Sequence, residues 1–259
     1  MAETNIQRAN EAWKNGAENY SRIVCDELSS FRGAGWQKLI TEQTGGKQEM
    51  RVLDIGCGPG FFTILLTQLG HRVTGMDATD EMRRYAQYNL EKTGVSAEII
   101  RGDAVEPPFD DNTFDLLLSR NVSWTLPDHP HAYREWLRIL KPGGVLLIFD
   151  ANWHHPGLTA QSRAEQRARV EKTIRTFGSD FNGHTSVDDL RDPEESSGHG
   201  SEDFGVLRDF VRPDWDIGML SAIGYRDISY DRDITGPLWD DKEKMIFETT
   251  PMFMIRAVK

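Results

Sequence analysis

The chain has 259 residues and a composition typical of a soluble globular protein, and we expect a single α/β domain with one insertion. Its formal net charge of −11 and pI near 5.1 argue against a nucleic-acid surface, which needs clustered Lys and Arg. We expect a cytoplasmic protein without a disulfide framework or zinc site. It has only two cysteines, Cys25 and Cys57, no apolar run of the ~20 residues that span a bilayer, and a polar start unlike a signal peptide.

The N-terminal segment predicts helices. Residues 3–30 have helical character in two pieces, with a break near Gly16. Trp13 and Tyr20 stand seven positions apart, so they share one face if the helix is nearly continuous, and core packing would explain both. Residues 32–35 (RGAG) predict a turn, followed by a short helix over 36–41.

A glycine-rich turn organises the chain. Residues 51–55 (RVLDI) predict a buried strand, and Gly56, Gly58 and Gly60 predict a tight turn before a helix over 61–69. This order brings backbone N–H groups and a helix N-terminus against a ligand, and glycine allows the ligand to approach closely. The spacing Gly-x-Gly-x-Gly differs from the dinucleotide fingerprint by its third glycine.

Two acidic residues follow at predicted strand ends. The strand over 71–76 ends at Asp77, 23 residues after Asp54, where a carboxylate can accept both ribose hydroxyls. A helix over 80–94 and a short strand over 97–100 come next, and that strand ends in Gly102-Asp103-Ala104. A side-chain acceptor beside an exposed backbone amide can bind an adenine edge there.

The next strands predict the other side of the crevice. Residues 114–119 and 145–149 predict strands four and five, with a loop over 107–112, a helix over 131–140 and a turn over 140–144 between them. The loop after strand four carries Arg120, Asn121 and Trp124, which are candidates to contact the cofactor or the substrate. Alternatively, Arg120 pairs with a nearby carboxylate and Trp124 fills the core.

The C-terminal part contains an expected insertion. Strand five leads to His154 and His155, which suggest a general base or a substrate contact more than a metal site, since adjacent histidines rarely bind one ion. After a helix over 159–177, the acidic Ser/Gly-rich stretch 187–204 predicts a mobile loop within an insertion of about 55 residues. A helix from Pro213 to Gly224 and strands over 225–231 and 251–258 complete the chain.

Together these motifs resemble the class I S-adenosylmethionine-dependent methyltransferases, and are most similar to the small-molecule branch that includes ubiquinone- and menaquinone-pathway enzymes. The resemblance covers about residues 13–152. It implies a three-layer α/β/α Rossmann-like sheet of seven strands in the order 3-2-1-4-5-7-6, with strand 7 antiparallel. It also implies a helical cap at 1–45 over the cofactor site, a Rossmann-like domain at 46–259, and an inserted lid or substrate region at 153–212.

The resemblance also implies an activity and a site. The enzyme would bind S-adenosyl-L-methionine, release S-adenosyl-L-homocysteine, and transfer the methyl group to a small-molecule acceptor by in-line displacement. It would act as a monomer or homodimer without nucleic acid. The implied cofactor-binding residues are Trp13, Tyr20, Asp54, Gly56, Cys57, Gly58, Gly60, Asp77, Ala78, Met82, Gly102, Asp103, Ala104, Arg120, Asn121 and Trp124. Asp54 would anchor the methionine ammonium, unless it only caps the turn.

A catalytic base is not obligatory for this chemistry, and the candidates by position are Tyr20, His154 and His155. Two other functions remain open. A nicotinamide-dependent oxidoreductase would share the strand, turn, helix and acidic residue, but should show Gly-x-Gly-x-x-Gly and a catalytic Tyr/Lys or His set. A non-catalytic S-adenosylmethionine-binding protein would keep the motifs and lack an acceptor pocket.

Overall fold

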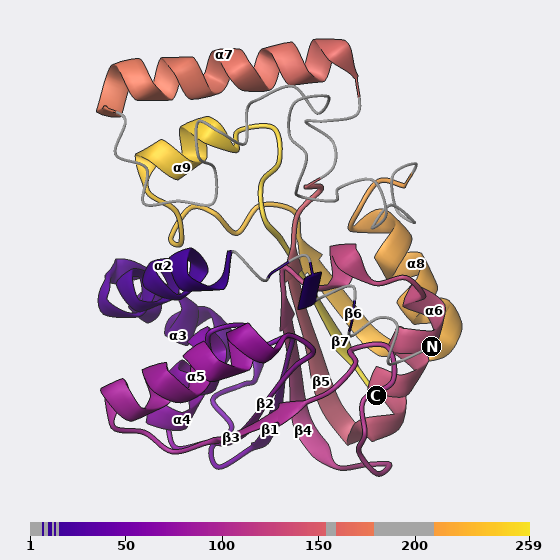
Figure 1. Ribbon diagram of the computed structural model, residues 1–259. Helices are drawn as coiled ribbons and strands as arrows, with labels where there is room; N and C mark the ends of the chain where they lie inside the picture. Colours follow the sequence, from indigo (N-terminus) through magenta and orange to yellow (C-terminus); the bar gives the residue numbers. More distant parts are fainter. Residues whose placement is uncertain (1–6, 8–9, 12, 14–15, 154–158, 179–209) are drawn as a thin grey trace.

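A seven-stranded sheet in the order β3-β2-β1-β4-β5-β7-β6 forms the centre of the computed structural model (Figure 1). The structure describes residues 7, 10–11, 13, 16–153, 159–178 and 210–259. The strands are β1 (Arg51–Ile55), β2 (Arg72–Asp77), β3 (Glu98–Arg101), β4 (Phe114–Arg120), β5 (Leu140–Asp150), β6 (Arg226–Asp231) and β7 (Phe253–Val258). The first five are parallel, and β7 is antiparallel to both β5 and β6. The predicted fold class, strand order and direction of strand 7 are confirmed.

Helices cover both faces of the sheet. They are α2 (Ala17–Ser29), α3 (Phe31–Gln43), α4 (Phe61–Gln68), α5 (Asp80–Thr93), α6 (His129–Ile139), α7 (Ala160–Phe177), α8 (Asp214–Ile223) and α9 (Asp241–Ile246), with a 3-10 turn η1 (Ser123–Thr125). The helices α2 to α5 lie on one side, and α6 and α8 lie on the other (Figure 1). The helix α7 packs against α9 beyond one end of the sheet, the upper end in Figure 1.

Aromatic side chains fill the core on both faces. On the α3 and α4 face, Trp36 meets Phe62 and Phe149 edge to face, with ring centroids 5.1 and 4.9 Å apart. On the α6 face, Tyr133 and Trp136 are fully buried. Burial on both faces explains why the central strands have continuous apolar runs rather than alternating ones.

The predicted turn at residues 32–35 is wrong, because α3 runs through it. Ser30 caps the helix by accepting the N–H of Arg32. The two glycines serve helix packing instead of a turn. A Cβ at Gly33 would lie 2.7 Å from the carbonyl oxygen of Leu28, and one at Gly35 would lie 2.9 Å from that of Pro237. Close approach of other backbone segments therefore requires glycine inside this helix.

Two further elements differ from the sequence prediction. The strand β5 begins at Leu140, so the expected turn over 140–144 is part of an irregular strand whose pairing with β4 shifts between Phe114 and Leu116. The helix α9 was not predicted, although Asp240 and Glu243 form a capping box that marks its start. The acidic stretch 187–204 lies outside the described residues, so its predicted mobility is not addressed.

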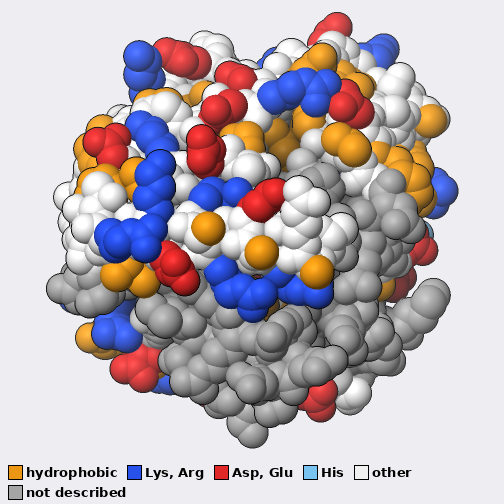
Figure 2. Space-filling model, turned by 90° about the horizontal axis from the view of Figure 1, so that it is seen from above, with side chains coloured by type: hydrophobic (Ala, Val, Ile, Leu, Met, Phe, Trp, Pro, Cys, Tyr) orange, Lys and Arg blue, Asp and Glu red, His pale blue; other side chains and the backbone are white. Residues whose placement is uncertain are grey.

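No helix in the described part of the chain is long and apolar enough to cross a membrane. Viewed from the α7 side, the described surface carries acidic and basic side chains close to one another (Figure 2).

Candidate active site

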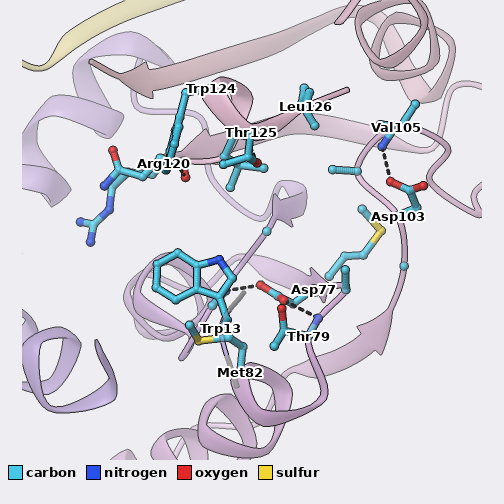
Figure 3. A pocket seen from close by; sticks show the side chains of 18 of the residues that line it. Trp13, Asp77, Thr79, Met82, Asp103, Val105, Arg120, Trp124, Thr125 and Leu126 are labelled. Carbon is cyan, nitrogen blue, oxygen red and sulfur yellow. Dashed lines mark hydrogen bonds between the residues drawn. The ribbon is translucent and has the colours of Figure 1, made fainter. Parts of the chain in front are cut away.

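A cavity of about 360 Å³ opens where the carboxyl ends of β1, β2, β3 and β4 meet (Figure 3). This is where ligands bind in open parallel α/β sheets. Its lining contains most of the residues that the sequence predicted for the cofactor. Those lining residues are Trp13, Tyr20, Gly56, Gly58, Asp77, Ala78, Met82, Gly102, Asp103, Ala104, Arg120, Asn121 and Trp124. Asp54, Cys57 and Gly60 are not part of the lining.

The glycine-rich turn forms the floor of the cavity. Gly56 and Gly58 have φ values of 64° and 53°, in the left-handed region that favours glycine. A Cβ at Gly56 would lie 2.3 Å from Val122, and one at Gly58 would lie 3.4 Å from the ring of Tyr20. Glycine is thus required at Gly56 by the close approach of Val122 as well as by its φ, and at Gly58 by its φ.

Asp77 is held by backbone amides at the tip of β2. Its Oδ2 accepts the N–H of Gly58 and its Oδ1 accepts the N–H of Thr79, each at 2.8 Å. The side chain lies beside Trp13 in Figure 3. Burial raises the pKa of this carboxyl, although the two amides favour its charged form. A fixed carboxylate with remaining lone pairs in the cavity fits the hydroxyls of a ribose.

Next to this, the carboxylate of Asp103 lies in a mainly apolar part of the cavity. Asp103 accepts the N–H of Val105 at 2.9 Å, and the carbonyl oxygen of Ala104 accepts the indole N–H of Trp136 at 2.8 Å. The side chains of Met76, Val105 and Leu126 complete this part of the lining. An apolar slot with polar atoms at its edge suits a flat heteroaromatic ring.

Asp54 has a structural role in this conformation. Its Oδ2 accepts both the backbone N–H and the hydroxyl of Thr63, at 2.9 and 2.7 Å, so it caps the first turn of α4. Burial raises its pKa to about 6. These contacts favour the interpretation in which Asp54 caps the turn, while its predicted contact with the methionine ammonium stays a prediction. Burial also raises the pKa of the Cys57 thiol.

Arg120 pairs with a carboxylate, as one of the two sequence interpretations had it. Its two terminal nitrogens donate to the two oxygens of Glu27, each at 2.8 Å. The guanidinium also lies over the ring of Phe61, 4.5 Å from its centroid. In Figure 3 it points away from the other labelled side chains. The charge of Arg120 is therefore used to fasten α2 to β4.

The loop after β4 presents a tryptophan to the cavity. Asn121 has a φ of 57°, and its carbonyl oxygen accepts the indole N–H of Trp124 at 2.9 Å. The side-chain oxygen of Asn121 is buried and has no partner among the described residues, so it does not offer an acceptor to the cavity. Trp124 lies across the cavity from Trp13 (Figure 3).

The N-terminal segment covers the end of β2. The rings of Trp13 and Tyr20 lie 5.7 Å apart and both line the cavity. Asn10 donates to the carbonyl oxygen of Ala78 at 3.2 Å and accepts the N–H of Asp80 at 2.8 Å. Trp13 and Tyr20 therefore line the cavity near the end of β2, and the predicted cap over the cofactor stays a prediction.

A buried ionic cluster behind the cavity was not predicted. Arg212, Asp150 and Asp216 are 3%, 0% and 0% exposed, and Arg212 donates to both carboxylates and to Ser123. His129 is also buried, with Nε2 donating to the carbonyl oxygen of Ser123 at 2.6 Å. Burial lowers its pKa to about 4, so it is neutral. No local motif marked Arg212, which lies at the end of the predicted insertion.

The remaining candidates cannot be placed. His154 and His155 lie outside the described residues. Within the part of the chain that the structure describes, no group of His, Cys, Asp and Glu side chains is arranged to hold a metal ion.

The sequence family described as a methyltransferase domain matches residues 53–148. The demethylmenaquinone methyltransferase of Staphylococcus aureus (strain MRSA252) is 30% identical over 154 residues, which are 57% of this chain and 62% of that protein. The chain thus spans less than two thirds of the length of the curated relatives it matches.

Solved structures show the same fold. A protein of Methanococcus maripaludis assigned to the S-adenosyl-L-methionine-dependent methyltransferases has a TM-score of 0.59 and 21% identity, over 95% of this chain and 93% of that one. Phosphoethanolamine N-methyltransferase 2 of Haemonchus contortus, in complex with S-adenosyl-L-methionine, has a TM-score of 0.57 and 18% identity, over 86% of this chain and 52% of that one. Together with the family match, these comparisons confirm the resemblance to class I methyltransferases.

Proposed function

We propose that this chain, whose residues 53–148 match a methyltransferase domain, transfers a methyl group from S-adenosyl-L-methionine to a small-molecule acceptor. The observation that carries the proposal is the cavity in which the glycine turn, Asp77 and Asp103 meet. Each group matches one part of that cofactor. The proposed division into a cap at 1–45 and a lid at 153–212 stays a prediction.

The residues present fit this cofactor. Asp77, already positioned by Gly58 and Thr79, would hold the ribose, and Asp103 would hold the adenine edge. The turn at Gly56 and Gly58 leaves room for the methionine moiety. When bound, the sulfonium supplies an already activated methyl group. The protein then has to align the acceptor and exclude water, and in this proposal the rings of Trp13 and Tyr20 do so.

The other side of the cavity supports an uncharged, planar acceptor. The charged side chains among the described lining residues are Asp77, Asp103 and Arg120, and Arg120 is paired with Glu27. The indole N–H groups of Trp124 and Trp153 are bonded within the protein, to Asn121 and Asp150. The two tryptophans therefore offer no free indole N–H to an acceptor. The S. aureus relative is named for demethylmenaquinone, and a quinone ring would suit such a wall.

The catalytic base stays open within this proposal. Tyr20 lines the cavity and could take a proton from the acceptor. His154 and His155 remain candidates by their position after β5. An acceptor that reacts without losing a proton to the protein would need none of the three.

Calorimetric titration tests the proposal. The purified chain should bind S-adenosyl-L-methionine and S-adenosyl-L-homocysteine with micromolar dissociation constants and give no heat with NADH. Binding of NADH alone would replace the proposal with the oxidoreductase interpretation. If the first two bind, a panel of quinols, phenols and amines with methyl-labelled cofactor should yield a labelled product. No product from any of them would favour a non-catalytic binding protein.

A further inference from the structure

Arg212 connects the end of the insertion to the loops that follow β4 and β5. It lies two residues before α8, in the first described segment after residue 209. Its Nη1 donates to Asp150 at 3.0 Å, one Nη2 bond reaches the hydroxyl of Ser123 at 2.7 Å, and Nε donates to Asp216 at 2.8 Å. One guanidinium thus holds three separate segments together.

The backbone of Arg212 is fixed as well. Its N–H donates to the side-chain oxygen of Asn152 at 3.1 Å, and its carbonyl oxygen accepts from the Asn152 amide nitrogen at 3.0 Å. Asn152 follows directly after β5. The position of Arg212 relative to that strand is therefore set at both the backbone and the side chain.

Asp150 connects Arg212 to two tryptophans through hydrogen bonds. Its Oδ2 accepts the backbone N–H of Trp124 at 2.9 Å, and its Oδ1 accepts the indole N–H of Trp153 at 3.0 Å. Both tryptophans line the cavity. The same Oδ2 also accepts from Arg212 and from Ser123. A carboxylate that makes this many bonds has one allowed orientation, which fixes the backbone of Trp124 and the indole of Trp153.

The charge of Arg212 does not cancel the charges of its buried partners. One arginine faces two buried carboxylates, Asp150 and Asp216. The hydroxyl of Tyr133 donates to Asp216 at 2.5 Å, and N–H and O–H groups around Asp150 supply the remaining stabilisation. The cluster therefore depends on the planar fork of arginine, which a lysine ammonium cannot reproduce.

We propose that Arg212 is a positioning residue that sets the rings of Trp124 and Trp153 through Asp150, and so couples the end of the insertion to one wall of the cavity. That this wall receives the methyl acceptor rests on the proposed function. The positioning of the two rings does not depend on it.

The test uses the full chain labelled with 5-fluorotryptophan, which gives seven fluorine resonances, one for each tryptophan. Trp124→Phe and Trp153→Phe identify the two relevant signals. Arg212→Lys keeps the charge and should shift both signals while leaving that of Trp36, identified with Trp36→Phe, in place. Asp150→Asn alters the carboxylate that pairs with Arg212 and should shift at least one of the two tryptophan signals. S-adenosyl-L-homocysteine should bind Arg212→Lys within about threefold of the unsubstituted chain.

A matched control is Arg232→Lys, because Arg232 makes a similar fork to Asp214 on the surface. It should leave the signals of Trp124 and Trp153 unchanged. Unchanged signals in both Arg212→Lys and Asp150→Asn would overturn the proposal, and so would an equal shift of all seven resonances. If the unsubstituted chain failed to bind S-adenosyl-L-homocysteine, the proposed function would fall, but the fluorine spectra would still decide the positioning role.

Discussion

Different groups hold the two walls of the cavity in place. Backbone amides hold the wall at the ends of β1, β2 and β3, whereas a buried arginine holds the wall at the ends of β4 and β5. On the first wall, Asp77 is held by the N–H groups of Gly58 and Thr79, which belong to neighbouring strand ends. On the second, Trp124 and Trp153 are held through Asp150 and Arg212. Parallel strand register sets the first wall, and tertiary packing of distant segments sets the second.

Because of this difference, we expect substitutions in the two walls to affect different properties of the protein. Removing a side chain from the first wall leaves the sheet and its amides in place, so ligand binding should suffer more than folding. Removing the arginine from the second leaves buried charge without a partner, so folding should suffer first.

Arg212→Met should have the largest effect, on stability. The substitution leaves Asp150 and Asp216 buried without a cation, which typically costs about 3–5 kcal/mol. Urea unfolding should show this loss. The control Arg232→Met removes an exposed pair with Asp214, whose side chains are 52% and 56% exposed, and should change the free energy of unfolding by less than about 1 kcal/mol. Equal losses in the two variants would contradict the assignment of a structural charge to the second wall.

The two walls should also respond oppositely to acid. Asp54, beneath the first wall, has a pKa raised to about 6, so its contribution to stability is full below its unfolded pKa and is lost as the pH rises through 6. His129, behind the second, has a pKa lowered to about 4, so its contribution is full above its unfolded pKa and is lost as the pH falls toward 4. Each contribution is about 3 kcal/mol at most, and the two oppose each other between pH 4 and 6.

Single substitutions should expose these opposing contributions. Relative to the unsubstituted chain, Asp54→Asn should lose more stability on acidification from pH 7 to 4, because His129 then acts alone. His129→Gln should lose less, or gain, because Asp54 then acts alone. Unfolding free energies measured at several pH values give both slopes. If both slopes change in the same direction, at least one of the two pKa shifts has the wrong sign.

The same contrast explains how much of each wall could be predicted from the sequence. The glycine turn, Asp77 and Asp103 were predicted because each follows directly from a local pattern and parallel strands bring their carboxyl ends to one edge. Asp150 and Arg212 are 62 positions apart, and no pattern in either segment marks the pair. Local patterns also misled where tertiary contacts decided the outcome, as at Gly33 and Gly35, which permit close packing of α3 and do not end it.

Asp54 shows the same limit within the first wall. Its place at the end of β1 predicted a ligand contact, but the hydroxyl and amide of Thr63, nine positions later, occupy one of its oxygens. The sequence predicts where this carboxylate lies, but its hydrogen-bond donor depends on how α4 packs against β1.

Asp77→Ala should have the converse effect to the arginine substitution, because it acts on binding. It removes the acceptor proposed for both ribose hydroxyls, and the dissociation constant for S-adenosyl-L-homocysteine should rise by an amount worth ~2–3 kcal/mol in calorimetry. The substitution also leaves the N–H groups of Gly58 and Thr79 unpaired, so Asp77→Asn, which keeps one acceptor oxygen, separates loss of the ribose contact from loosening of the turn. Asp80→Ala is the matched surface control, since Asp80 pairs with Arg83 at the start of α5 and should leave binding unchanged. An unaltered dissociation constant in a folded Asp77→Ala variant would remove the ribose assignment, and with it the claim that the amide-supported wall is the cofactor side.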